Sequence, residues 1–397
     1  MIESKYVLSI DVDGEKYKYN LINGYYAKEK DTENSKNFYV NENTNEFKKL
    51  IEYNYGLRSN SDFICITLEI TKECNFRCVY CFQNHEKRKL GIESIPELGK
   101  IIKEYVKRNI QIKKLVVIWF GGEPTMNIPY ICNANKMLKD LSNEMELTYS
   151  SRIISNGYLL NEIIPYIKEW NLSDIQITFD GTKKIHDSRR KCLDNTGSFD
   201  KIVDNILLIH DKVDLIIRVN VDSENIDNIY DLYDMIRKLR FDSRVQLYFQ
   251  PMLVENYGGE SECYLGNTIQ DEKLYEKYIK LLIHTKSIIK PCFLKAFCNV
   301  DFPGSLVVSS EARLFKCWAE SGDERKAFAQ IGADNYSKIV EEMSRGYFQI
   351  KDEACYECKF FPVCMGGCKY KKYDKEECAK RQRMITEKIK YCIRNKI

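Results

Sequence analysis

From residue 63 onward, short runs of consecutive apolar residues alternate with longer stretches in which apolar residues recur every three or four positions. The short runs are typical of strands buried on both faces, and the longer period is typical of helices that cover a sheet. Strands are predicted at 63–70, 114–120, 150–155, 174–179, 213–221 and 245–250. Helices are predicted between them at 94–108, 129–143, 160–169, 198–210 and 226–239. This order predicts an α/β fold with a parallel sheet, curved or closed, and helices outside it.

The first 60 residues show a different pattern, in which apolar and polar residues alternate over short runs. Residues 6–12 and 16–21 alternate around Asp13-Gly14-Glu15, which is typical of a hairpin. Residues 37–40 indicate a further strand, and 46–55 a short helix. The sequence therefore predicts a small N-terminal α+β unit over 1–60, followed by a larger domain over 61–255.

The rest of the chain is predicted to contain two more regions. A linking segment over 256–290 holds a helix at 271–289. A cysteine-rich domain over 291–397 holds a hairpin, with strands at 305–308 and 313–316, and ends in a basic helix at 379–396.

Composition narrows the possible functions. Charged residues make up 30% of the 397 residues, and the net charge is +3 with both signs interspersed, which argues against a nucleic-acid partner. No apolar stretch approaches a membrane span and no signal peptide follows Met1, so we expect a cytoplasmic protein with no membrane partner. The 16 cysteines, beside only 4 histidines, indicate thiolate metal sites rather than disulfides in a reducing compartment.

The first cysteine group lies in the segment TKECNFRCVYCFQ at 71–83. Cys74, Cys78 and Cys81 have C-x3-C-x2-C spacing directly after the first predicted strand of the larger domain. Thiolates this close on one loop suit either an iron–sulfur cluster or zinc. A closed zinc site needs a fourth ligand, for which His85 is the local candidate, whereas a cluster with three cysteines leaves one iron open. The spacing alone leaves both interpretations open.

With the aromatic Tyr80 before its last cysteine, this loop resembles the signature of radical S-adenosylmethionine (radical SAM) enzymes. The resemblance implies a partial (β/α)6 barrel whose site lies at the carboxyl ends of the strands. It also implies that Cys74, Cys78 and Cys81 hold a [4Fe–4S] cluster, whose reduction cleaves SAM to a 5′-deoxyadenosyl radical that removes a hydrogen atom from the substrate. An external one-electron reductant such as flavodoxin or ferredoxin is implied as a partner.

Further segments at strand ends resemble the SAM contacts of this family. A GGEP segment ends the second strand, and its paired glycines allow close backbone approach to a ligand. The fourth strand leads to an aspartate, for which a helix N-cap is the competing role, and then to HDSRR at 186–190, in which we expect His186 to be structural. The last arginine of that run is similar to the one that pairs with the SAM carboxylate. The cofactor-binding residues implied by the resemblance are Tyr80, Phe82, Gly121, Gly122, Glu123, Pro124, Ser155, Asn156, Asp180 and Arg190.

Most of the other cysteines follow residue 290, at spacings that also occur in zinc-ribbon domains. Behind a radical SAM barrel they resemble the SPASM domain, which implies two auxiliary [4Fe–4S] clusters and three clusters in total. The implied ligands are Cys292, Cys298, Cys317 and Cys368 for the first auxiliary cluster and Cys355, Cys358, Cys364 and Cys378 for the second, with Cys392 as the alternative to Cys378. This chain departs from the family pattern at Ala312, where the hairpin has a glycine. The cysteines outside both sets are expected to act as small apolar residues: Cys65, Cys132, Cys192, Cys263 and Cys392.

The resemblance covers about residues 63–380 and implies an enzyme that modifies a peptide. Sulfatase-maturating relatives place an aspartate base directly after the hairpin cysteine, where this chain has Trp318. We therefore favour a maturase of a ribosomally made precursor peptide with a leader, and first of all one that forms a thioether from a Cys sulfur to a carbon, as in sactipeptides and ranthipeptides. The alternatives are formylglycine formation, C–C or C–O crosslinking, and a non-enzymatic, zinc-stabilised interaction module. Residues 1–60 would bind the leader or cap the end of the barrel.

Overall fold

The computed structural model describes residues 1–32, 35–81, 83, 85–239, 247–253, 272–287, 290–293, 298–345, 350, 352–368 and 374–397. The chain divides into two compact units: unit 1 comprises Met1–Asn60, Ile288–Phe302 and Gly346–Ile397, and unit 2 comprises Ser61–Ser287 and Pro303–Arg345. No helix in the described ranges is long and apolar enough to cross a membrane. The domain limits expected at residues 60, 255 and 290 stay predictions.

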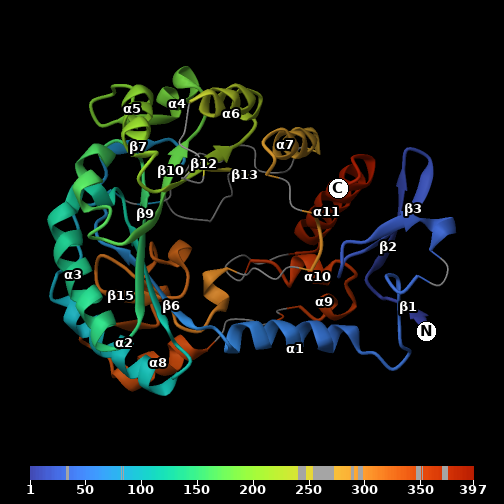
Figure 1. Ribbon diagram of the computed structural model, residues 1–397, viewed down its shortest axis with the longest axis horizontal. Coiled ribbons are helices and arrows are strands. Elements are labelled where there is room, and N and C mark those ends of the chain that lie inside the picture. Colours follow the sequence, from blue (N-terminus) through green and yellow to red (C-terminus); the bar gives the residue numbers. More distant parts are fainter. Residues whose placement is uncertain are drawn as a thin grey trace. The chain divides into compact units, whose positions relative to one another are not determined.

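Unit 2 is built on one nine-stranded sheet in the order β13-β12-β10-β9-β8-β6-β14-β15-β16, in which β13 to β6 are parallel neighbours. The six parallel strands are β6 (Phe63–Glu69), β8 (Lys114–Phe120), β9 (Thr148–Ser155), β10 (Leu172–Phe179), β12 (Asp214–Val221) and β13 (Leu247–Leu253). The α-helices of this unit are α2 (Ser94–Arg108), α3 (Ile128–Glu144), α4 (Lys183–Arg189), α5 (Phe199–Ile209), α6 (Ile229–Lys238), α7 (Glu272–His284) and α8 (Tyr336–Ser344). Helices α2, α3 and α5 cover the outside of the curved sheet (Figure 1). The predicted α/β fold is confirmed.

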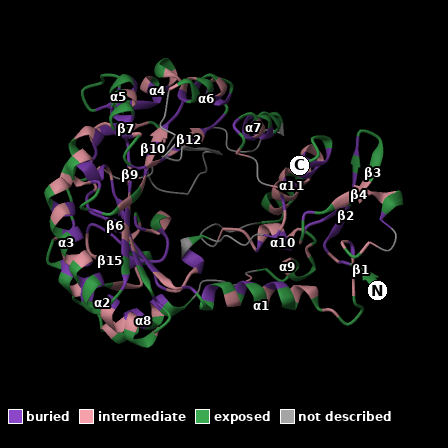
Figure 2. Cartoon of the chain, viewed as in Figure 1, coloured by how far each residue is buried: buried purple, intermediate pink, exposed green. Residues whose placement is uncertain are grey.

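The hydrophobic pattern explains how the sheet and helices pack. Strand β6 is buried at six of its seven positions, as expected for a strand covered on both faces. Helix α2 buries Leu98, Ile101, Ile102 and Tyr105, which recur at helical spacing, and leaves its charged side chains outside. Figure 2 shows the result: the strands are mostly buried, and the outer faces of the helices are exposed.

Two predicted helices differ from the observed elements. The segment predicted as a helix at 160–169 is a 3-10 helix, Leu160–Tyr166, that contains Pro165. Proline lacks the N–H that an α-helix needs at an interior position, which accounts for the difference. The segment predicted at 226–239 begins as a 3-10 turn, Ile226–Asn228, and becomes α6 only at Ile229.

The edge of the parallel sheet is extended by strands from much later in the chain. Strand β14 (Ser305–Val308) pairs in parallel with β6, from Ser305 opposite Cys65 to Val308 opposite Leu68. Strands β15 (Arg313–Phe315) and β16 (Ala329–Gln330) then add antiparallel to it. In the β14–β15 turn, Ala312 has a φ of +59°, the left-handed conformation that glycine adopts more readily. The hairpin was predicted, whereas its pairing with β6 was not.

Unit 1 combines the two ends of the chain in one core. It contains β1 (Ile2–Glu3), β2 (Val7–Val12), β3 (Glu15–Asn20), β4 (Tyr26–Lys28), β5 (Tyr39–Val40), α1 (Glu46–Ser59), α9 (Ala354–Glu357), α10 (Phe361–Cys364) and α11 (Lys375–Arg394). The hydrophobic cluster joins Tyr6, Tyr19 and Leu21 from the N-terminal strands to Phe361 and Ile389 from the C-terminal helices. Residues 1–60 therefore share their core with the cysteine-rich tail.

Candidate functional site

The first cysteine loop lies at the carboxyl end of β6 and is held as a short ladder. Its strand β7 (Phe76–Cys78) pairs antiparallel with β11 (Arg190–Cys192), so that Cys78 lies opposite Arg190 and Phe76 opposite Cys192. Just beyond the ladder, the Val79 N–H donates to the Arg189 carbonyl at 3.0 Å. The ladder joins the cysteine loop to the arginine that the sequence had assigned to the SAM carboxylate.

The glycines of the GGEP segment allow that segment to approach the start of the cysteine loop closely. The Gly122 N–H donates to the Thr71 carbonyl and the Glu123 N–H to the Glu73 carbonyl, both at 2.8 Å. A Cβ at Gly121 would lie 2.3 Å from the Thr71 carbonyl oxygen, and one at Gly122 would lie 2.3 Å from the Glu73 carbonyl oxygen. The backbone of the cysteine loop therefore excludes any larger residue at both positions. The sequence did not indicate this packing role of the two glycines.

Glu123 links this segment to the end of β9. Its buried carboxylate accepts hydrogen bonds from the Thr125 hydroxyl at 2.5 Å, the Ser155 hydroxyl at 2.9 Å and the Asn156 N–H at 2.6 Å. Burial raises the pKa of this carboxyl group, and the hydrogen bonds oppose the shift. Pro124 begins the 3-10 helix that follows.

Asn156 then connects β9 to the cysteine loop. Its side-chain amide donates to the Asn75 carbonyl oxygen at 2.7 Å and lies 3.8 Å from the Cys74 Sγ. Asn156, predicted as a cofactor contact, thus lies beside the first cysteine, and Ser155 is linked to it through the Glu123 carboxylate.

The three cysteines of the loop differ in their surroundings. Burial, with a smaller contribution from the negative charge of Glu123, raises the pKa of the Cys74 thiol to about 12. Burial raises the pKa of the Cys78 thiol to about 11 although the positive charge of Arg190 lowers it. Cys81 Sγ lies 3.6 Å from His85 Nε2. In the described part of the chain, no three Cys, His, Asp or Glu side chains are grouped closely enough to hold a single metal ion; a four-iron cluster is larger than a single ion, so its thiolates stand farther apart.

The two arginines after α4 have different partners. Arg189 is held by Asp222, with Nη2 at 2.6 Å from Oδ2, and also contacts Glu224 at 3.4 Å. Arg190 donates from Nη1 to the Tyr80 hydroxyl at 2.6 Å, while its buried Nε has no hydrogen-bond partner among the described residues. The Arg189 Nε also lacks a hydrogen-bond partner among the described residues, but its guanidinium already faces the carboxylates of Asp222 and Glu224. Arg190 is therefore the better placed of the two for an anionic ligand.

Asp180 also presents an unsatisfied atom beside these arginines. Its Oδ1 accepts from the Asn220 N–H at 3.3 Å, while its buried Oδ2 makes no hydrogen bond within the described ranges and lies 3.7 Å from the Arg189 Nε. The competing N-cap role is not observed, because helix α4 begins after Thr182, whose N–H donates to the Asn228 side chain at 2.7 Å.

The HDSRR run has structural contacts that the sequence did not specify. His186 is buried, with Nε2 3.1 Å from the Ser198 hydroxyl, and that hydroxyl donates to the Arg190 carbonyl at 3.0 Å. Asp187 accepts from the Ser198 and Phe199 N–H groups at 2.8 and 2.9 Å, at the start of α5. The run therefore fixes the backbone around Arg190, as expected for a structural His186.

Glu69, the last residue of β6, is a buried carboxylate that sequence analysis did not single out. It accepts from the Ser310 N–H at 3.2 Å and from the Gln83 side chain at 3.5 Å. Burial raises its pKa to about 7. A single acidic residue at the end of the apolar run FICITLEI was the available signal.

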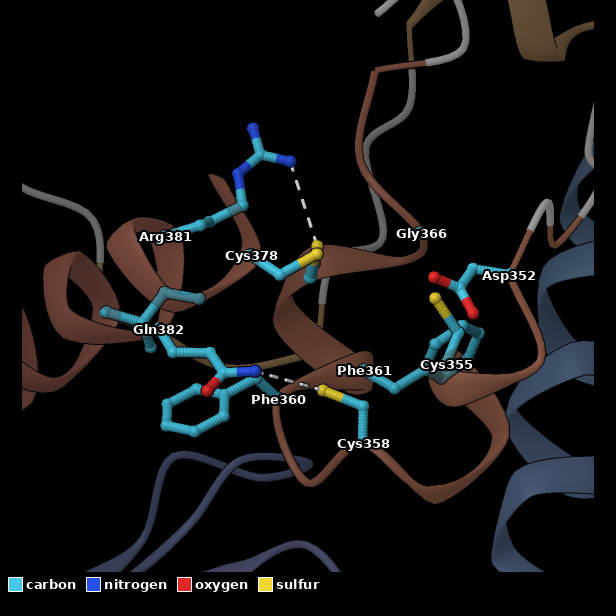
Figure 3. A pocket seen from close by; sticks show the side chains of 11 residues that line it. Asp352, Cys355, Cys358, Phe360, Phe361, Gly366, Cys378, Arg381 and Gln382 are labelled. Atoms are coloured by element: carbon cyan, nitrogen blue, oxygen red, sulfur yellow. Dashed lines mark hydrogen bonds between the residues drawn. The ribbon is translucent and has the colours of Figure 1, made fainter. Parts of the chain in front are cut away.

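A second cysteine group surrounds a cavity in unit 1 (Figure 3). Cys355 and Cys358 come from the segment around α9, Cys364 ends α10, and Cys378 lies on α11. All four line a cavity of about 70 Å³ together with Asp352, Phe360, Phe361, Arg381 and Gln382. Cys392, the alternative to Cys378, is buried and is not among the residues that line this cavity. The structure brings together the four cysteines assigned to the second auxiliary cluster.

The remaining predicted ligands belong to different units. Cys292, Cys298 and Cys368 lie in unit 1, and Cys317 lies in unit 2 after β15. Their assignment to one cluster stays a prediction. Phe82 and Cys263 lie outside the described residues. Of the cysteines expected to act as small apolar residues, Cys65, Cys192 and Cys392 are buried, and Cys132 is half-buried.

Comparison with known families decides how the first site is classified. The model of the radical SAM superfamily matches residues 68–236, which include the cysteine loop, the GGEP segment and Arg190. The chain contains a radical SAM domain. Radical SAM proteins use SAM and a [4Fe–4S] cluster, and the cysteine-rich C-terminal part is consistent with a SPASM domain.

Two relatives align with this chain over different lengths. A cysteine-type anaerobic sulfatase-maturating enzyme of Clostridium novyi (strain NT) is 28% identical over 339 residues, which is 76% of this chain and 86% of that protein. The radical SAM cyclopropyl synthase TigE of Paramaledivibacter caminithermalis is 30% identical over 137 residues, which is 30% of this chain and 28% of that protein.

Solved structures show the same fold. Native anSMEcpe with bound AdoMet and the Cp18Cys peptide has a TM-score of 0.64 at 19% identity and covers 85% of this chain and 100% of that one. Streptococcus suis SuiB bound to the precursor peptide SuiA has a TM-score of 0.55 at 14% identity, with 92% of this chain and 95% of that one covered.

The residues of the radical SAM domain fit the cofactors of the superfamily. Three cysteines lie on one loop at the end of β6, and thiolates are the ligands that an iron–sulfur cluster requires. Beside them, Asp180 Oδ2 and Arg190 Nε are buried polar atoms without a hydrogen-bond partner in the described part of the chain. Buried polar atoms are normally paired, so these two are suited to the polar groups of a ligand.

Proposed function

We propose that the protein is a radical SAM enzyme that oxidises a side chain of a peptide substrate. The observation that carries the proposal is the convergence of the cysteine loop, Asn156 and Arg190 at the carboxyl ends of the parallel strands. The SuiB structure contains the precursor peptide SuiA and the anSMEcpe structure contains the Cp18Cys peptide, which supports a peptide as the substrate class.

In this proposal each part of the loop has a role. Cys74, Cys78 and Cys81 hold the [4Fe–4S] cluster, which supplies the electron that splits SAM into methionine and a hydrogen-abstracting deoxyadenosyl group. The GGEP segment, Ser155 and Asn156 hold the methionine end of SAM, and Arg190 pairs with its carboxylate while Tyr80 orients the guanidinium. Asp180 accepts a hydrogen bond from the nucleotide.

The tail supplies two further clusters in this proposal, giving three in all. Cys355, Cys358, Cys364 and Cys378 hold the second auxiliary cluster, and Cys292, Cys298, Cys317 and Cys368 hold the first. A substrate that forms a new bond after losing one hydrogen atom must also lose an electron, which an auxiliary cluster accepts. The external reductant is a flavodoxin or ferredoxin, and the enzyme acts in the cytoplasm.

Thioether formation is the reaction we propose first, because of Trp318. The Trp318 ring packs edge-on against Phe120, with centroids 6.0 Å apart, and it follows Cys317 directly. An indole N–H donates hydrogen bonds but accepts no proton, so this position lacks the base expected for formylglycine formation. A cysteine thiol of the substrate would instead bond to a carbon of the same peptide.

Formylglycine formation is the second candidate, because the sulfatase-maturating relative from Clostridium novyi matches 86% of its own length. In that reaction a side chain other than residue 318 acts as the base. Glu69 is the candidate, because it is a buried carboxylate on β6 and lies opposite Phe120 of β8 in the sheet register.

The N-terminal strands offer a place for a leader peptide. Among the described residues, strand β4 lies at an edge of the sheet β2-β3-β4, which is where one more strand would pair. We propose that a leader adds there.

Anaerobic turnover tests the proposed function. The reconstituted protein is incubated with SAM, dithionite and either a Cys-containing candidate precursor peptide or a sulfatase-derived Cys peptide. We expect deoxyadenosine, and a loss of two hydrogens per crosslink in the precursor peptide by mass spectrometry; loss of the cysteine sulfur from the sulfatase peptide would favour the second candidate. A Cys78→Ala variant is the negative control. Absence of deoxyadenosine with both peptides would refute the proposal.

A further inference from the structure

Two side chains of α11 reach the second cysteine group in unit 1. Arg381 Nη1 lies 3.7 Å from the Cys364 Sγ, and Gln382 Nε2 lies 3.7 Å from the Cys358 Sγ (Figure 3). Both are N–H donors directed at sulfur, within the distance of a sulfur hydrogen bond. They follow Cys378 by three and four residues on the same helix, which places all three side chains on one helix face.

The cavity contains few other polar groups. Asp352 is its carboxylate, and Phe360, Phe361 and Ile385 supply apolar walls. Among the residues that line the cavity, Asp352 is the acidic side chain and Arg381 the basic one. Arg381 is therefore the cation that counteracts the negative charge of the four sulfurs and Asp352.

The physical consequence concerns electron affinity. Reducing an iron–sulfur cluster adds one negative charge, which spreads onto the ligand sulfurs. A nearby cation and N–H donors to those sulfurs stabilise the reduced form, and apolar walls keep this interaction from being screened by water.

We propose that Arg381 and Gln382 raise the reduction potential of the cluster held by Cys355, Cys358, Cys364 and Cys378, so that it accepts the electron removed from the substrate. This inference rests on the proposed function. Crosslinking removes two hydrogens: one leaves as an atom that forms deoxyadenosine, and the other leaves as a proton to solvent and one electron. That electron reduces the cluster from the 2+ to the 1+ state, and an external one-electron carrier reoxidises it.

The experiment measures this potential in the full-length chain. A Cys74→Ala, Cys78→Ala, Cys81→Ala background removes the first cluster and leaves the tail intact. The anaerobically reconstituted protein is titrated with dithionite while the reduced clusters are followed by electron paramagnetic resonance, without SAM or peptide. In Arg381→Gln we expect the oxidised-to-reduced ratio at a fixed potential to rise at least tenfold, a fall of ~59 mV for a one-electron couple. Gln382→Leu should shift it in the same direction by less.

Arg383→Gln is the matched control, because Arg383 is exposed on the same helix, loses the same charge and does not line the cavity. Unchanged potentials in Arg381→Gln and Gln382→Leu at wild-type iron content would overturn the proposal. A wild-type tail that binds no iron would also overturn the proposal. Loss of the cluster in both variants would overturn it too, because Arg381 and Gln382 would then be needed only for cluster assembly. Failure of peptide turnover would refute the proposed function but would leave the measured shift unaffected.

Discussion

Gly122 illustrates how a single residue supports the first site. Its hydrogen position faces the Glu73 carbonyl oxygen, where a Cβ would lie at 2.3 Å. A side chain at this position would therefore clash with the protein backbone. The sequence alone suggested only that the glycine lets the backbone approach a ligand closely. Gly56 in α1 differs, because a Cβ added there would meet no atom of the described residues within 4 Å.

We predict that Gly122→Ala displaces the cysteine loop and lowers deoxyadenosine formation more than tenfold, because the contact cannot be relieved by a flexible side chain. Iron content and deoxyadenosine yield, measured on the reconstituted protein, check this. Gly56→Ala is the control and should leave both unchanged, with a gain in helix stability of about 0.5–1 kcal/mol. Wild-type iron content and yield in Gly122→Ala would show that the loop tolerates the displacement.

Glu69 gives a pH-dependent prediction. Burial, with a smaller contribution from Glu311, raises its pKa from 4.5 to about 7, although the Ser310 N–H and Lys72 lower the pKa. Between these values the folded protein holds a proton that the unfolded chain has released, so stability falls as the pH rises from 4.5 through 7. The full effect is at most about 3 kcal/mol.

Replacing Glu69 with Gln should remove this slope. We expect the urea midpoint of Glu69→Gln, measured relative to that of the wild type, to be higher at pH 8 than at pH 6, at equal cluster content. Glu144→Gln changes an exposed carboxylate of α3 in the same unit and should show no such gain. Parallel pH profiles for wild type and Glu69→Gln would contradict the assignment of the high pKa.

The residues of the first site fall into those that the sequence could identify and those whose contacts it could not. The C-x3-C-x2-C spacing and the GGEP run are local patterns, so they identified the loop and its neighbour. The bonds from Glu123 to Ser155 and Asn156, and from Arg190 to Tyr80, join residues 32 to 110 positions apart and depend on where strand ends meet. No local pattern encodes those contacts.

At the scale of elements, the β7–β11 ladder is the feature that positions the loop. Each strand has three residues, too short for a hydrophobic period, and the pairing therefore leaves no signal in the sequence. The six parallel strands, in contrast, have seven or eight residues, long enough to carry a hydrophobic pattern, and each of them overlaps a predicted strand. The parallel contact of β14 with β6 was also missed, because it joins segments separated by the whole barrel.

We predict that a proline at Lys191 disrupts the ladder. Lys191 is exposed and lies opposite Arg77 in the middle of the pair, so the substitution acts by removing a backbone donor. Lys191→Pro should lower iron retention in the first cluster and deoxyadenosine yield. Lys191→Ala keeps the N–H and should behave like the wild type, and equal effects of both substitutions would attribute the loss to the side chain.

At the scale of the whole molecule, unit 1 is assembled from both ends of the chain. Tyr6, Tyr19 and Leu21 share a core with Phe361 and Ile389, and the Phe47 and Phe361 rings lie 4.8 Å apart. The N-terminal strands therefore stabilise the segment that carries the second cysteine group. The sequence could not show this, since it separates the two parts by the entire radical SAM domain.

We predict that deleting residues 1–60 removes the iron of the second cysteine group as well as any leader binding. Iron per chain and protease resistance of the C-terminal segment would measure the loss. Leu21→Ala is a milder test, with an expected cost of about 2–5 kcal/mol in unit 1, and Tyr25→Ala, at 43% exposure, is its control. A truncated chain with a fully loaded tail would mean that the shared core is dispensable.

The shared core also has a consequence for biosynthesis. Helix α11 begins at Lys375, so the first 60 residues leave the ribosome about 300 residues before their packing partner. At 5–20 residues per second this delay is roughly 15–60 s. During that time Tyr6, Tyr19 and Leu21 lack the apolar surface that covers them in the finished chain, and chaperones that shield nascent apolar segments should increase the yield of intact protein.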